Sequence, residues 1–232
     1  MGKLLTIPSE ISADYDLVDS TLLSKEREFL TEIGDDKEPL DFFPQVKIKR
    51  WENESNFSMR LHQAGNVILN HRAGVVTTEQ DKLIWTGDGV RSEFRRRDLY
   101  GRPALQWTQV VPSRPLANNI KFTIQSKGLK FWYQPIEVDP PTVKINPPES
   151  SPDPFTSIRP DHIKGSYAVY HESKKHNEYK TGKAFHLYRP RITDDNGDAI
   201  WGELDINEQS RMLTINIDSQ WLNNAVYPIR VA

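Results

Sequence analysis

Hydrophobic and polar residues alternate with a period of two in several segments after residue 45, and this pattern restricts the fold more than any other feature of the sequence. In residues 120–125, Ile120, Phe122 and Ile124 would face one side of a strand, and the polar residues between them would face the other. Strands with one buried and one solvated face are typical of antiparallel sheets. The same alternation recurs at residues 46–49, 129–133 and 213–217.

Further short segments rich in β-branched and aromatic residues are separated by Gly, Asn and Pro. Together with the alternating segments they give ten or so strands, which predicts an all-β fold, an antiparallel β-sandwich of jelly-roll-like type, rather than an α/β fold. These further strand candidates are residues 66–73, 82–85, 91–95, 104–111, 166–171, 183–189 and 200–206.

Residues 1–45 lack strand alternation and are predicted to form an extended N-terminal arm with one short helix. The helix is expected over residues 22–33, with Ser20 or Thr21 as its N-cap. Apart from Glu26, one face of that helix is apolar, so it must rest on another surface. We therefore expect residues 1–45 to form an arm that docks on another surface rather than part of a folded core.

The charge of the chain is divided unevenly along its length. Residues 1–45 carry 11 acidic and 4 basic side chains, whereas residues 46–135 carry 7 acidic and 15 basic ones. This asymmetry predicts that the acidic arm pairs with a basic surface, either on its own β domain or on a neighbouring subunit.

Residues 139–160 hold seven of the sixteen prolines. A segment this rich in Pro cannot take part in a strand ladder and stays extended. It could be a linker between two domains or a long loop inside one. We favour the loop, because neither flanking half has enough strands to close a sandwich, and we assign residues 46–232 to a single β-sandwich domain.

The composition excludes several classes of protein. The absence of cysteine excludes a disulfide framework and sites that bind zinc or iron–sulfur clusters through Cys, and it favours a reducing compartment. The N-terminus has no apolar run typical of a signal peptide, and no segment is long enough to span a membrane. We expect a soluble protein without a cofactor.

Two motifs suggest ion binding at first sight, but both have a structural interpretation. His171, His176 and His186 lie close in sequence, yet they lack the spacing of a helical metal site, so surface histidines are the favoured interpretation. Residues 194–198 resemble a calcium loop in composition only. Their Asn-Gly pair predicts a tight turn between strands, with weak ion binding as the alternative.

Three other features could serve an enzyme or a binding site. Glu52 and Glu54 are predicted on one side of a strand, but paired catalytic carboxylates normally come from different elements, so we predict that the chain is not an enzyme. Residues 91–102 form the most basic window, in which two acids interrupt the run, so a basic rim that meets an acidic partner is favoured over nucleic-acid binding.

The many aromatic residues leave a sugar-stacking surface open as the alternative. Most aromatic side chains in sandwiches fill the core, and we expect Phe122, Phe131 and Tyr133 to point inward.

Several phrases of the sequence stand out: KRWENE at 49–54, GLKFWYQP at 128–135, GSYAVYH at 165–171, NEYKTGKAFHLYRP at 177–190, WGEL at 201–204, Trp221-Leu222, and AVYPI at 225–229. Together they resemble a signature of poorly characterised structural proteins of tailed bacteriophages. The resemblance extends, with gaps, over residues 46–232.

The resemblance implies a virion component that assembles in the host cytoplasm, either a capsid decoration (cement) protein or a tail-associated protein. Its partners would be the major capsid protein or a tail protein, and copies of itself, for example as a trimer. The chain ends soon after Tyr227-Pro228, where longer relatives continue, so we expect a compact protein on the shell rather than a receptor-binding one. The residues expected to make attachment contacts are Leu22, Phe29, Leu30, Ile33, Phe42 and Phe43, with Arg95, Arg96 and Arg97 as electrostatic contacts.

Overall fold

A computed structural model describes residues 9–26, 29–35, 37, 41–69, 74–136, 160–173 and 182–232. The chain divides into two compact units. Unit 1 consists of Met1–Leu129 and Pro190–Ala232, and unit 2 of Lys130–Arg189. Unit 2 is therefore inserted into unit 1 in sequence. The predicted Pro-rich loop at 139–160 falls in unit 2, and all of it except Pro160 lies outside the described residues.

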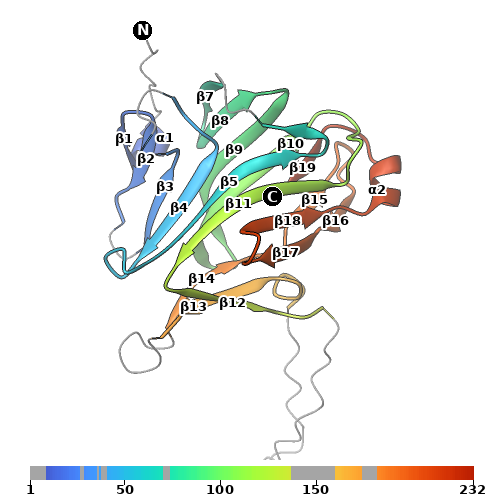
Figure 1. Ribbon diagram of the computed structural model, residues 1–232. Helices are drawn as coiled ribbons and strands as arrows, with labels where there is room; N and C mark the ends of the chain where they lie inside the picture. Colours follow the sequence, from blue (N-terminus) through green and yellow to red (C-terminus); the bar gives the residue numbers. More distant parts are fainter. Residues whose placement is uncertain are drawn as a thin grey trace, which may run out of the picture. The chain divides into compact units, whose positions relative to one another are not determined.

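Two antiparallel sheets face each other in unit 1 (Figure 1). In spatial order, the main path of the larger sheet, sheet A, is β1 (Tyr15–Val18), β2 (Thr21–Ser24), β3 (Phe29–Ile33), β4 (Gln45–Arg50), β5 (Ser55–Ala64), β11 (Asn119–Lys127), β18 (Met212–Asn216) and β17 (Glu203–Asn207), and β6 (Val67–Ile68) pairs with β5. The smaller, sheet B, has the order β16 (Ala199–Trp201), β15 (Arg191–Thr193), β19 (Ile229–Val231), β10 (Arg102–Val111), β9 (Val90–Leu99), β8 (Lys82–Gly87) and β7 (Val75–Glu79).

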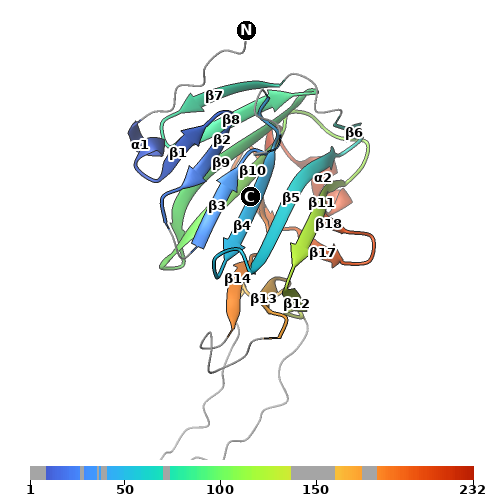
Figure 2. The same cartoon turned by 60° about the vertical axis from the view of Figure 1, so that its left-hand side comes forward.

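The chain crosses between the two sheets several times: after β6 and after β10 (Figure 2), and after β16 and after β18 (Figure 1). Such crossings close a sandwich around one core and give it a jelly-roll-like character. The two described helices are short: α1 (Ser9–Ser12) precedes β1, and α2 (Ser219–Asn224) lies between β18 and β19. The predicted antiparallel β-sandwich is confirmed.

Aromatic side chains from both sheets meet in the core of unit 1. Trp107 of sheet B packs edge-on against Phe122 of sheet A, with ring centres 5.0 Å apart, and Phe94 lies 4.7 Å from Trp107. Burying each such side chain contributes about 1.5–3 kcal/mol. Trp85 is also buried, because Gly87 leaves room for its ring: a Cβ there would lie 2.6 Å from the indole.

The structure corrects the interpretation of residues 22–33 as a helix: residues 22–24 belong to β2 and residues 29–33 form β3. The short helix of the N-terminal segment is α1 instead. β3 pairs with β4 along its whole length, and Ile33 lies opposite Val46. No structural boundary therefore separates residues 45 and 46, and the N-terminal strands belong to the same sheet as the rest of unit 1.

Unit 2 contains a three-stranded sheet in the order β12 (Leu129–Tyr133), β13 (Tyr167–His171) and β14 (Lys183–Leu187). β13 and β14 are antiparallel, with Tyr167 opposite Leu187. Aromatic rings of unit 2 pack in pairs: the ring centres of Tyr133 and Tyr167, for example, lie 5.2 Å apart. These strands match three of the segments predicted from sequence.

Candidate interaction surface

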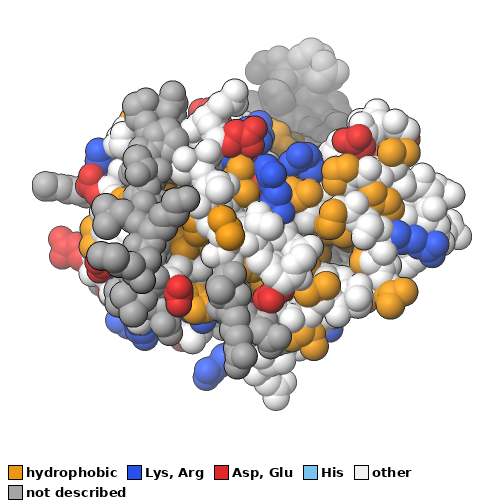
Figure 3. Space-filling view, turned by 90° about the horizontal axis from the view of Figure 1, so that it is seen from above, with side chains coloured by type: hydrophobic (Ala, Val, Ile, Leu, Met, Phe, Trp, Pro, Cys, Tyr) orange, Lys and Arg blue, Asp and Glu red, His pale blue; other side chains and the backbone are white. Residues whose placement is uncertain are grey.

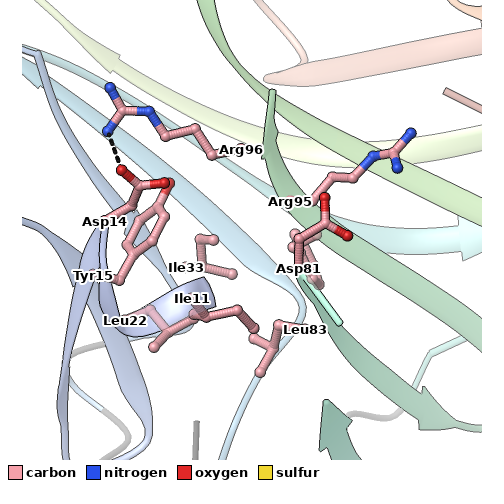
Figure 4. Close-up of a pocket in the computed structure, with 10 residues that line it drawn as sticks. Ile11, Asp14, Tyr15, Leu22, Ile33, Asp81, Leu83, Arg95 and Arg96 are labelled. Atoms are coloured by element: carbon pink, nitrogen blue, oxygen red, sulfur yellow. Dashed lines mark ion pairs between the residues drawn. The ribbon is translucent and has the colours of Figure 1, made fainter. Parts of the chain in front are cut away.

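A pocket in unit 1 lies between the N-terminal strands and the strands β8 and β9 (Figure 4). Tyr15, Leu22 and Ile33 line one side and Leu83 the other. Its free volume is about 30 Å³, which has room for water. Organic ligands need pockets of about 300 Å³ or more, so this pocket is not a substrate site.

Arg96 joins the acidic N-terminal segment to sheet B at the rim of this pocket. Its guanidinium lies 3.5 Å from Asp14 and 2.8 Å from Glu26. Beside it the hydroxyl of Tyr15 is 3.1 Å from the hydroxyl of Thr31, and burial raises the pKa of Tyr15. Arg96 therefore makes its electrostatic contacts within its own chain.

Two more acids of the N-terminal segment pair with the basic middle of the chain. Glu32 forms ion pairs with Lys49 and, at 3.8 Å, with Lys47, and Asp35 pairs with Arg60. The prediction that the acidic segment meets a basic surface is thus confirmed for the chain's own β domain.

The apolar residues expected to make attachment contacts do not form one exposed face. Leu22 and Ile33 are 1% and 2% exposed, and Phe42 is also buried. Their side chains pack inside unit 1, because they lie on the inner face of sheet A or next to it. The remaining three are half-buried: Phe29, Leu30 and Phe43.

The consecutive arginines of β9 point to opposite faces of sheet B, as successive residues of a strand do. Arg96 faces the N-terminal strands, whereas Arg95 and Arg97 lie on the outer face. The amide oxygen of Gln106, on β10, accepts hydrogen bonds from Arg95 at 2.9 Å and Arg97 at 3.0 Å. The hairpin register places Arg102 opposite Leu99 on this same face, whereas the basic window at 91–102 did not single out Arg102.

A buried carboxylate lies on the outer face of the same sheet. Glu93 is contacted by Arg91 at 2.8 Å, Arg230 at 3.1 Å and Lys82 at 3.3 Å. Burial on its own would raise the pKa of Glu93, but the hydrogen bond from Arg230 and the three positive charges together lower it. Glu93 is therefore a structural anion that holds three strands together.

Ser166 and His186 of unit 2 form a pair that resembles part of a hydrolase site, with 2.7 Å between Oγ and Nε2. The Ser166 hydroxyl is fully buried and donates its proton to the carbonyl of Ile163. It must then accept a hydrogen bond from His186, so the imidazole cannot act as its base.

The other histidines that the structure describes form no metal site. His171 is 6% exposed, which corrects its interpretation as a surface residue, because it lies on β13 within the sheet of unit 2. His176 lies outside the described residues. Across the described ranges, no group of three His, Cys, Asp or Glu side chains is placed to hold a metal ion.

The two acidic motifs are turns. Glu52 lies in the β4–β5 turn with a positive φ of 53°, so Glu52 and Glu54 do not share a face of a strand. Residues 194–198 form the predicted turn. The Asp194 carboxylate caps the backbone N–H groups of Asp198 and Val226, both at 2.9 Å, and is thus occupied by the protein itself.

Exposed apolar side chains are scattered over unit 1. The most exposed large one in the described chain is Leu116, at 93%, in the loop after β10. The space-filling view in Figure 3 shows hydrophobic side chains reaching the surface at several separate places. Single exposed apolar residues are normal on protein surfaces, so the outer face of the β9–β10 hairpin is the stronger candidate surface.

No protein-family model, no curated protein and no solved structure matches this chain. Among the described residues, no helix is long and apolar enough to cross a membrane.

Proposed function

We propose that this chain is a non-enzymatic structural protein of a tailed-bacteriophage virion, a capsid decoration (cement) protein that binds and stabilises the shell. The observation that supports this most is the outer face of the β9–β10 hairpin. There Arg95 and Arg97 are held in place by Gln106 rather than by a carboxylate in the described part of the chain. Arginines positioned in this way suit carboxylate groups of a partner protein. The sequence resemblance supports the choice of a virion as the assembly.

The architecture of unit 1 suits a protein that must carry load. The ion pair of Glu32 joins β3 to β4 within sheet A, that of Arg96 joins the N-terminal segment to sheet B, and Glu93 ties the C-terminal strand β19 to β9. Contacts between segments so far apart in sequence oppose local opening of the terminal strands. A tail-associated position would use the same properties, and it is the alternative within this class.

A carbohydrate-binding adhesion module is the second candidate, because unit 2 exposes aromatic side chains. Trp132 is 59% and Tyr133 44% exposed, so Tyr133 does not point into a core as expected from its place in the sequence. Phe122 of unit 1 does, at 3% exposed. Exposed aromatic rings on a sheet edge could stack against sugars.

One experiment separates the two candidates. Purified chain is mixed with assembled capsids, with isolated tails, and with a glycan array, under matched buffer conditions. A decoration protein is expected to co-sediment with capsids to saturation, and less at about 1 M than at about 0.1 M salt, since the Debye length falls from about 10 to about 3 Å. Saturable glycan binding without sedimentation on either particle would instead support the adhesion module.

A further inference from the structure

The far half of the β9–β10 hairpin extends beyond its neighbours in sheet B. β8 pairs with β9 only as far as Phe94, and β19 pairs with β10 only from Gln109 onward. Residues 95–99 and 102–108 therefore form a two-stranded ribbon whose outer backbone edges have no strand partner among the described residues. We call this part the basic hairpin.

The basic hairpin presents three arginines to one side. Arg95, Arg97 and Arg102 lie on its outer face, and in the described chain none of them forms an ion pair. Of the nearby acids, Asp98 follows Arg97 and so lies on the other face of the strand, where its carboxylate accepts the N–H of Gly101 at 2.8 Å. Asp81 lines the same pocket as Arg95 (Figure 4) without an ion pair to it.

An acidic strand lies at the edge of the other sheet. β17 is the last strand of sheet A, with β18 as its one strand neighbour in the described part of the chain. Glu203 and Asp205 on β17 and Glu208 in the following turn are exposed, and no ion pair of theirs is found among described residues. Arg211 is the single cation of that turn. We call these three acids and their strand the acidic edge.

The basic hairpin and the acidic edge are complementary in charge, and the backbone of each can pair with a further strand. Each has an open strand edge, and a strand edge is a template for pairing with another chain. Three exposed carboxylates on one surface match three guanidinium groups on the other, which steers approach and fixes orientation. Strand addition with flanking charge pairs is a common mode of protein recognition.

We infer that the acidic edge of one copy binds the basic hairpin of a second copy, head to tail. The two surfaces are different patches of the chain, so the contact is heterologous and generates a ring where the rotation closes and a filament where it does not. A small ring agrees with the homo-oligomer that the sequence resemblance implies. The inference extends the proposed function without depending on it.

The test uses charge reversal on the full chain and measures its assembly state by sedimentation velocity. The variants R97E/R102E and E203K/D205K each replace one surface by its opposite charge at exposed positions. At about 0.05 M salt the wild type is expected to self-associate, and each variant alone to associate at least about tenfold more weakly. An equimolar mixture of the two variants should associate again, because each contact between the two different variants joins opposite charges.

The matched control is E52K/E172K, which makes the same change in charge as E203K/D205K at two exposed positions elsewhere and should assemble like the wild type. Circular dichroism checks that all variants are folded. The inference is overturned by a wild type that stays monomeric at low salt, by an assembly that neither variant weakens, or by a mixture that remains monomeric. Nucleic acid bound through the arginines without self-association would also overturn it.

Co-sedimentation with capsids is measured separately for E203K/D205K, which keeps Arg95 and Arg97, the arginines that the proposed function uses for attachment to the shell. Capsid binding that survives in this variant leaves the proposed function standing even where self-association fails.

Discussion

At the scale of single residues, Glu93 shows how a buried charge can connect distant parts of the chain. Its carboxylate joins β8, β9 and β19 through Lys82, Arg91 and Arg230. An isolated buried carboxylate would be costly, and the three cations offset that cost. Removing the charge leaves three cations close together, so we expect Glu93 to matter more than any exposed ion pair of the molecule.

We predict that Glu93→Gln lowers the free energy of unfolding by about 1–3 kcal/mol at neutral pH. Because folding lowers the pKa of Glu93, its stabilising effect is complete above its ordinary value of 4.5 and is lost as the pH falls through the lower folded value. Urea unfolding of both proteins at decreasing pH should therefore show their difference shrinking in acid.

Glu52→Gln, in an exposed turn, serves as the control and should change stability by no more than about 0.5 kcal/mol. A difference between wild type and Glu93→Gln that is the same at all pH values would show that the substitution acts through packing and not through charge.

At the scale of elements, long alternating segments could be predicted from sequence and short apolar ones could not. β11 has three inward residues in strict alternation, and its face was correctly predicted. Residues 21–33 contain two strands of four and five residues, whose apolar positions also fit a helical period. For such short segments the choice between helix and strand is made by tertiary pairing, here by β4.

The candidate surface was only partly predictable for a similar reason. A run of three arginines indicates a basic window, and strand alternation predicts that Arg96 faces away from its neighbours. The hydrogen bonds of Gln106 and the place of Arg102 depend on the register of the β9–β10 hairpin, which no local pattern specifies. The ends of β8 and β19, which leave the hairpin edges open, likewise depend on long-range pairing.

The place of β2 in the core gives a test at this scale. Leu22 is 1% exposed, so Leu22→Ala should lower the free energy of unfolding by about 2–4 kcal/mol. Val18 on β1 is 50% exposed, and Val18→Ala should cost no more than about 1 kcal/mol. Chemical denaturation of both variants and the wild type measures these two changes in the free energy of unfolding. Equal, small effects would mean that the N-terminal strands are a docked arm after all.

At the scale of the whole molecule, the chain consists of a sandwich interrupted by an insertion. Residues 130–189 form unit 2, and the chain then returns to sheet B at β15. The sequence alone favoured a single domain over 46–232, because neither half beside the Pro-rich segment has enough strands to close a sandwich. Which strands share a sheet depends on pairing between residues far apart, such as Gln109 with Val231.

The central claim is that this chain binds a phage shell and stabilises it. The most direct measurement is the temperature at which capsids lacking this chain release their DNA, with and without added protein. We predict that the release temperature rises with the amount of bound chain and stops rising once the binding sites are filled. An unchanged release temperature, with no chain sedimenting on the capsids, would contradict the claim.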